Sequence, residues 1–194
     1  MASTVRDEDW YGEDVTERGV DGVEFVRCDL SETTSPAGLS FADCTFRMTK
    51  FNVADYTGAS FANCTFVDCN FFGATLRECK FVGATFRECS FDQLTIDGGD
   101  WSFTSFIAAD LRNVSIRGVR MREADLSSAR GNGMTLRDTD LSGAQLEKVD
   151  FTKADLRGSD LTALDPWQAT LTGARIDAIQ AMTIAMALGL DVRD

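Results

Sequence analysis

The sequence predicts an all-β solenoid that ends in a C-terminal α-helix. A large apolar residue recurs at every fifth position, a small residue lies two positions before most of them, and the pattern changes after residue 176. A period of five fits neither the 3.6 residues of a helix turn nor the alternation of a flat strand. It fits a chain that turns a corner every five residues and points its large side chains toward a common axis.

The large apolar residues recur at a constant spacing of five. Counting in fives from Phe41 to Leu161 gives a large apolar residue at twenty-four of twenty-five positions. The exception is Gly131, which predicts a local kink or bulge, with Met134 filling the gap. The main predicted core residues are Phe61, Phe66, Phe71, Phe81, Phe86, Leu141, Phe151 and Leu156.

The small positions account for every cysteine. All six occupy the slot that alanine fills in other repeats: Cys28, Cys44, Cys64, Cys69, Cys79 and Cys89. In that slot cysteine behaves as a small hydrophobic residue. The chain has no histidine to complete a metal site, so no metal and no cofactor are expected. Bridges between cysteines twenty residues apart remain an alternative, although a cytoplasmic location favours reduced thiols.

The N-terminal repeats keep the spacing of five in another phase. They place apolar residues at Trp10, Val15, Val20, Phe25 and Leu30. The step to the next large residue is eleven, one more than two repeats, so residues 31–38 (SETTSPAG) must absorb one residue. Serine, proline and glycine there suit a small loop. The loop either corrects the register or also contacts a partner.

The C-terminal segment predicts a capping helix. Asp177 is the expected N-cap, Gln180 has capping-box spacing, and Gly189 is the expected residue C′. One face can seal the last coil, and the remaining apolar surface predicts a two-fold dimer through this end. The alternative is a monomer whose helix lies flat on its own coil. The predicted interface residues are Trp167, Ile179, Met182, Ile184, Met186, Leu188 and Leu190. Residues 1–178 would form the solenoid, and residues 177–194 the helix and tail that dimerise.

Charge limits the classes of function. The net charge is -12, with -7 in residues 1–32, none in 33–137 and -5 in 138–194. This balance argues against direct binding to nucleic acid and favours a basic partner. The absence of histidine removes the commonest general base, so an enzyme is not expected. No stretch predicts a signal peptide or a membrane span, which indicates the cytoplasm.

Several repeats carry a family motif. The runs ADLSS at Ala124, TDLSG at Thr139, ADLRG at Ala154 and SDLTA at Ser159 follow the pattern A-D/N-L/F-x-x. This pattern resembles the pentapeptide-repeat proteins over roughly residues 10 to 178. The resemblance implies a right-handed, four-sided β-helix with four five-residue repeats per coil.

The C-terminal part is similar to one branch of that family, the MfpA-like and Qnr proteins. The similarity rests on the DPW break at residues 165–167 and the helix that ends in ALGLDV. It implies a homodimeric DNA mimic that binds DNA gyrase, and in some cases topoisomerase IV. The implied effect is inhibition of gyrase or its protection from quinolones or other poisons, as antibiotic resistance or self-immunity.

Outward acids are the expected partner contacts: Asp140, Asp150, Asp155, Asp160 and Asp165. Two alternatives stay open. These aspartates could serve only to hydrogen-bond the corners of the repeats, and the protein could be a non-catalytic interaction scaffold with an unknown partner.

Overall fold

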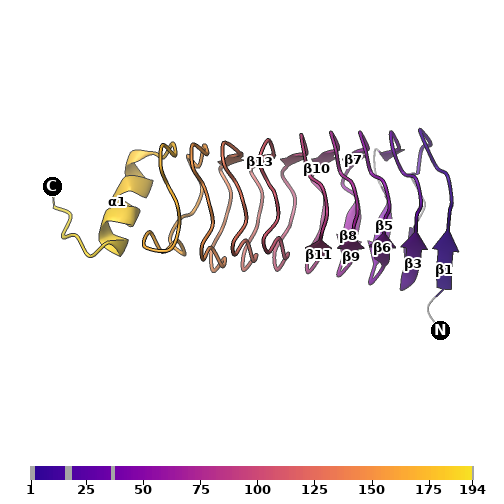
Figure 1. Ribbon diagram of the computed structural model, residues 1–194, viewed down its shortest axis with the longest axis horizontal. Coiled ribbons are helices and arrows are strands. Elements are labelled where there is room, and N and C mark those ends of the chain that lie inside the picture. The colour runs from indigo at the N-terminus through magenta and orange to yellow at the C-terminus, as the bar shows by residue number, and fades with distance from the viewer. Residues whose placement is uncertain (1–2, 16–18, 36–37, 194) are drawn as a thin grey trace.

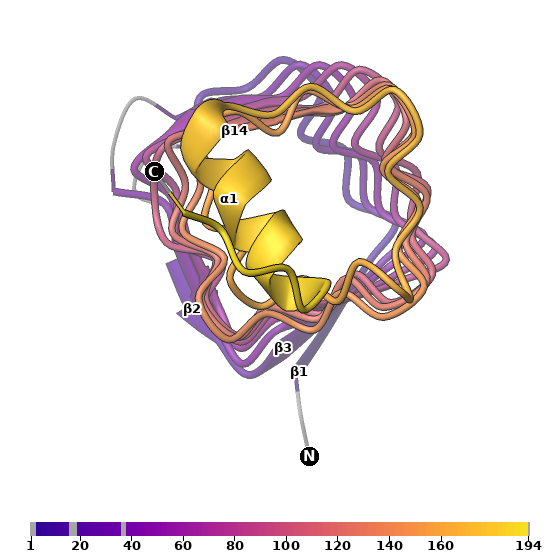
Figure 2. The same ribbon diagram turned by 90° about the vertical axis from the view of Figure 1, so that its left-hand side faces the viewer.

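The computed structural model describes residues 3–15, 19–35 and 38–193. These residues form a rod of stacked coils with a helix, α1, at its C-terminal end (Figure 1). Seen along the rod, the coils superpose in a roughly square outline (Figure 2). The predicted four-sided β-solenoid with a C-terminal helix is therefore confirmed.

Short strands build three parallel sheets along the sides of the rod. The first sheet contains, in spatial order, β1 (Ser3–Arg6), β3 (Val23–Val26), β6 (Thr45–Arg47), β9 (Thr65–Val67) and β11 (Thr85–Arg87). The second contains β14 (Thr135–Arg137), β13 (Ser115–Arg117), β12 (Thr95–Asp97), β10 (Thr75–Arg77), β7 (Asp55–Thr57) and β4 (Thr34–Ser35). The third contains β2 (Gly19–Asp21), β5 (Ser40–Ala42) and β8 (Ser60–Ala62).

The pairing register shows how the chain absorbs its extra residue. Partners in later coils are twenty residues apart, as in Thr65 and Thr85. Where the pair spans residues 36–39 the offset is twenty-one, as in Glu24 and Thr45. The ladder thus accommodates one extra residue in this segment of the chain. The loop tip at residues 36 and 37 lies outside the described residues, so a partner contact there stays a prediction.

Aromatic rings stack along the interior. In one column, the ring centroids of Phe25, Phe46, Phe66, Phe86 and Phe106 are 4.9, 5.1, 4.9 and 4.6 Å apart in succession. The strand spacing of about 4.8 Å sets this distance, and each stacked pair adds roughly 0.5–1.5 kcal/mol to the gain from burial. All eight predicted core residues are buried.

The coil at Gly131 corrects one expectation. The predicted kink or bulge is absent, because the Gly131 N–H donates to the Asp150 carbonyl at 2.8 Å and Arg130 pairs with Asp150 in the regular ladder. Met134 is fully buried, and its sulfur lies 2.6 Å from where a Cβ at residue 131 would stand. The flexible methionine fills the space of the missing side chain, so the backbone needs no adjustment.

The six cysteines are free and occupy the inward small slot, as predicted. Five are buried, whereas Cys89 is half-buried. Burial raises the pKa of the Cys79 thiol to about 11, which keeps it protonated at neutral pH. Among the described residues, no group of three or more cysteine and acidic side chains is arranged to hold a metal ion.

Helix α1 (Ala178–Ala187) closes the C-terminal end of the rod (Figure 2). The predicted capping box is present, since Asp177 accepts from the Gln180 N–H and the Gln180 side chain accepts from the Asp177 N–H. The buried Gln180 amide also donates to the Leu156 and Ser159 carbonyls, at 2.6 and 2.7 Å. The Gln180 side chain thus caps the helix and also supplies hydrogen bonds to two backbone carbonyls beneath it. None of the helices in the described ranges has the length and apolar character to cross a membrane.

Candidate partner-binding surfaces

The aspartate of the repeat motif has a structural role. In all five predicted contact residues, Oδ1 accepts a hydrogen bond from the backbone N–H two residues later, at 2.9 to 3.4 Å. Asn70 makes the same bond to the Phe72 N–H at 3.0 Å. Aspartate and asparagine therefore recur at this position, because a carboxylate oxygen and an amide oxygen can both accept the backbone N–H of the turn. The hydrogen-bonding alternative accounts for one oxygen of each aspartate and leaves Oδ2 for other contacts.

Asp140 and Asp160 are the only two of the five that share a partner. Ser142 Oγ lies 2.6 Å from Asp140 Oδ1 and 3.0 Å from Asp160 Oδ2. The hydroxyl of Ser142 and the guanidinium of Arg122 lower the pKa of Asp140 to about 2. The Thr162 hydroxyl lowers the pKa of Asp160, although the nearby Asp140 charge opposes this shift. Both carboxylates are therefore ionised at neutral pH.

Two of the five predicted acids are neutralised locally. Arg122 Nε lies 2.6 Å from Asp140 Oδ2, and Arg157 Nη2 lies 2.7 Å from Asp155 Oδ2. The Arg157 side chain lowers the pKa of Asp155 to about 2. A basic partner would have to compete with these arginines, so Asp140 and Asp155 contribute less to an anionic surface than the sequence suggests.

The other three acids form no ion pair with a described lysine or arginine. Asp150 accepts from Asn132 Nδ2 at 2.6 Å, and Asp165 accepts from Gln168 Nε2 at 2.8 Å. The Thr152 hydroxyl lowers the pKa of Asp150, and the Gln168 amide lowers that of Asp165. Asp150, Asp160 and Asp165 are thus ionised and uncompensated.

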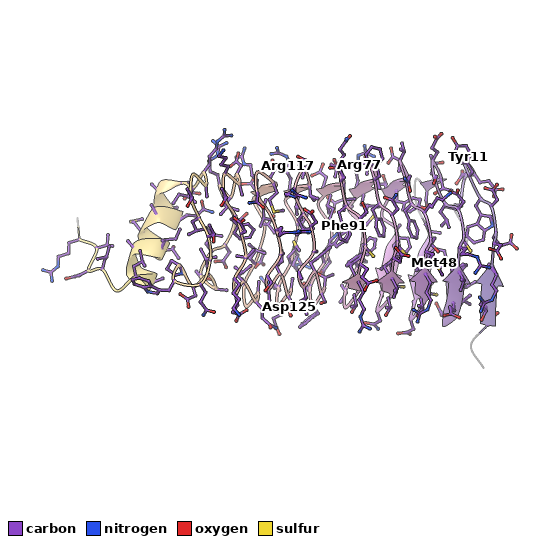
Figure 3. The ribbon with its side chains drawn as sticks, in the orientation of Figure 1. Tyr11, Met48, Arg77, Phe91, Arg117 and Asp125 are labelled. Atoms are coloured by element: carbon purple, nitrogen blue, oxygen red, sulfur yellow. The ribbon has the colours of Figure 1, made fainter. Side chains whose placement is uncertain are left out.

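The solenoid distributes these acids over its sides. The ladder through Arg120 and Asp140 is separate from the ladder through Arg130 and Asp150, and Asp155 pairs with Thr135 in a third. Side chains project outward along the whole rod, with Arg117 and Asp125 on opposite sides (Figure 3). The predicted residues therefore form a distributed surface rather than one pocket.

Sequence reasoning missed the partners of these aspartates. Arg122 and Asp140, Asn132 and Asp150, and Ser142 and Asp160 all lie eighteen residues apart. This spacing is one coil minus the two residues that separate the motif aspartate from the next outward position. A search at a separation of eighteen would have found them.

The C-terminal apolar end is formed by exposed side chains on α1, the tail and the DPW turn. Six of the seven predicted interface residues are exposed: Trp167, Ile179, Met182, Met186, Leu188 and Leu190. The seventh, Ile184, is half-buried against the core, so it offers less surface to a partner than the other six. It lies one helical turn from the buried Gln180, on the face that seals the last coil. Val192, 44% exposed, extends the apolar surface and was not predicted.

Comparisons with protein families and solved structures identify related proteins. The family profile described as Pentapeptide repeats matches the chain between residues 54 and 162, more than half of its length. Two structures of trypsin-treated QnrB1, a plasmid-mediated fluoroquinolone resistance protein, each show a TM-score of 0.56 and 22% identity. Each match covers 99% of this chain and 98% of the QnrB1 chain.

A third structure, HetL from the cyanobacterium Nostoc sp. Strain PCC 7120, is described as involved in the regulation of heterocyst differentiation. It shows a TM-score of 0.39 and 18% identity, and covers 89% of this chain and 86% of its own. No curated protein matched the sequence. The repeat motif, the four-sided solenoid and the family match together show that the chain belongs to the pentapeptide-repeat family.

Proposed function

We propose that this protein is a non-catalytic DNA mimic that binds DNA gyrase in the cytoplasm. The observation that carries the proposal is the set of ionised, uncompensated carboxylates of Asp150, Asp160 and Asp165 on a rigid rod. The relatedness in fold to QnrB1, whose structure is described as that of a fluoroquinolone resistance protein, supports gyrase as the target. A groove built to hold duplex DNA would accept a rod of this kind.

The average charge density is too low for the whole surface to mimic DNA, so the mimicry would be restricted to certain sides of the rod. Each coil of twenty residues advances about 4.8 Å. A net charge of -12 over 194 residues therefore averages one charge per ~4 Å along the rod, against one per ~1.7 Å in duplex DNA. The rod carries less than half the density of DNA, so binding should rely on the sides where acids are unpaired. Such binding should weaken as salt rises.

The first prediction removes charge without removing the turn. The triple variant Asp150→Asn, Asp160→Asn and Asp165→Asn should keep the corner hydrogen bonds, because Asn70 already makes one. We expect about 10-fold more protein to be needed for half-maximal effect, equivalent to about 1.4 kcal/mol of lost binding. The readout is supercoiling by purified gyrase, with and without a fluoroquinolone.

The matched control changes the same number of charges elsewhere. Asp29, Asp100 and Asp110 make the same corner bond but are ion-paired with Lys50, Arg120 and Arg112, respectively. Their triple substitution by asparagine should leave the effect on gyrase within about twofold. An equal loss in both variants would contradict a localised surface. Supercoiling that is unaffected by a large excess of the unsubstituted protein would contradict the target itself.

The assay also separates the two modes of action. Less supercoiling without drug would indicate inhibition, and fewer drug-stabilised DNA breaks would indicate protection. Repeating it with topoisomerase IV would test the second target.

We further propose that two chains join through the C-terminal apolar end and double the length of the rod. Ile179, Met182 and Met186 follow one another at three and four residues, so they form one outer stripe of α1. An exposed apolar stripe of this kind suits a self-complementary two-fold contact. It would bring Asp160 and Asp165 of both chains toward the centre.

The second prediction tests this dimer. Met182→Glu places a charge in the stripe at a side chain that is 46% exposed, so the fold should tolerate it. Light scattering should then give the mass of one chain rather than two, because burying an unpaired carboxylate is costly. The control, Ile107→Glu, alters an apolar residue in the middle of the rod that is 55% exposed. An unchanged mass for Met182→Glu would place the interface elsewhere.

A scaffold for another protein remains the second candidate function. It is favoured by Phe103 and Ile107, exposed by 56% and 55% in the electrically neutral middle of the rod. Exposed aromatic and aliphatic side chains fit a protein surface better than a DNA groove. If Phe103→Ser and Ile107→Ser together weakened the effect on gyrase more than the aspartate variant, contacts unlike those of DNA would dominate.

A further inference from the structure

The N-terminal end of the rod differs from the C-terminal end. The N-terminal cavity, of about 360 Å³, is lined by inward-facing side chains of the first coils, mainly Val5, Trp10, Val20, Val23 and Phe25. Val5 and Trp10 are only half-buried, and Val20 is 41% exposed. At the other end, α1 and Gln180 cover the last coil. Among the described residues, no helix covers the first coil.

The backbone around this cavity ends in open strand edges. Strand β1 pairs only with β3, and β2 pairs only with β5, so each is the terminal strand of its sheet. A terminal strand presents N–H and C=O groups that an additional strand can pair with. The interior rings begin immediately behind, since the Trp10 and Phe25 centroids lie 6.0 Å apart. An incoming strand would therefore find hydrogen-bonding groups beside an apolar cavity.

Exposed acidic residues flank the cavity-lining Trp10 and Val20 in the sequence, and we call them the acidic rim. Glu8, Asp9 and Asp21 are exposed and form no ion pair with a described lysine or arginine, whereas Asp7 is paired with Arg27 at 2.7 Å. Residues 1–32 contain ten acidic and three basic residues. A second copy in this position would bring two such rims together, and the like charges would repel. Charge complementarity favours a basic occupant.

We propose that the N-terminal cavity binds an extended, cationic segment of a partner protein. The segment adds a strand to the edge formed by β1. Its apolar side chains enter the cavity between Val5, Trp10 and Val20, and its lysine or arginine side chains reach Glu8 and Asp21 on the rim. This site lies at the opposite end of the rod from the proposed dimer contact. Its test measures the binding of a peptide, so the result does not depend on gyrase.

The test uses a fluorescein-labelled peptide of ten residues that alternates lysine and valine. We expect its anisotropy to rise with the full-length protein, and its affinity to fall at least about 10-fold when salt is raised from about 50 to about 500 mM. Peptides that alternate glutamate with valine, or lysine with serine, should bind at least about 10-fold more weakly. Equal binding of the lysine–serine peptide would mean charge attraction alone and would overturn the proposal.

Substitutions at the N-terminal cavity test whether the lysine–valine peptide binds there. Val20→Glu, at an exposed position, should weaken the lysine–valine peptide at least about 10-fold, and so should Glu8→Lys combined with Asp21→Lys. Val53→Glu, the same change at a valine that is 52% exposed on a later coil, is the matched control and should leave binding unchanged. Equal binding by the unsubstituted protein and Val20→Glu, or no binding at all, would overturn the proposal. The acidic rim would then only keep open edges of separate molecules apart.

A second copy of this chain is the competing occupant. If Val20→Glu lowered the mass measured by light scattering while Leu190→Glu did not, the N-terminal end would be a contact between copies. That result would overturn the peptide site.

Discussion

Replacing Phe66 with alanine is expected to lower the free energy of unfolding by about 3–5 kcal/mol. The Phe66 ring is fully buried and stacked between those of Phe46 and Phe86, at 5.1 and 4.9 Å. Its strand, β9, is paired with β6 on one side and β11 on the other. Because these ladders hold the coils at a set spacing, the neighbouring rings cannot close the cavity that alanine would leave.

The change is measured by urea unfolding followed by circular dichroism. The matched control is Met48→Ala, which removes a large side chain that is 46% exposed at the corner beside the same column. Its effect should stay within about 0.5 kcal/mol. A loss of less than about 1 kcal/mol for Phe66→Ala would mean that the rings do collapse into the gap, and the ladders would not be rigid spacers.

Gly99→Ala is expected to destabilise the middle of the rod through two separate effects. Gly99 has a φ of +89°, which costs a residue with a side chain about 1–3 kcal/mol. A Cβ there would also stand 2.1 Å from the Cys79 carbonyl oxygen and 2.8 Å from the Cys79 nitrogen. The same oxygen accepts the Asp100 N–H at 3.0 Å, so relieving the clash would disturb the ladder between coils.

Gly118→Ala separates the two effects. Gly118 also has a positive φ, of +62°, but no atom lies within 4 Å of its would-be Cβ. Its substitution should cost only the conformational part, about 1–3 kcal/mol, and therefore less than Gly99→Ala. Similar unfolding midpoints in urea for the two variants would show that the close approach to Cys79 is relieved at no cost.

Much of this fold follows from local pattern. Each repeat of five residues places its own large and small side chains inward, so the core around Phe61, Phe81 and Leu156 could be read without knowing which coils are neighbours. The helix signals at Asp177 and Gln180 are equally local, because a capping box depends on residues three positions apart.

The candidate surface was less predictable. Outward positions carry no periodic constraint, so the sequence alone identified Asp140 and Asp155 as acids but not as partners of Arg122 and Arg157. The partial burial of Ile184 could not be predicted, because α1 is apolar almost all round and only its docking on the last coil selects the buried face. The expected kink at Gly131 failed because Met134 fills the space from within the same coil.

The sequence by itself determined the solenoid, its inward residues, the register correction before Phe41 and the helical cap. Only the tertiary structure decided which carboxylates are left unpaired and showed that, among the described residues, no helix covers the first coil. The inward pattern repeats within five residues, so one repeat is enough to read it. The Arg157–Asp155 pair is also local, but the Arg122–Asp140 pair and the contact of Gln180 with Leu156 join side chains eighteen or more residues apart, which meet only when the coils stack.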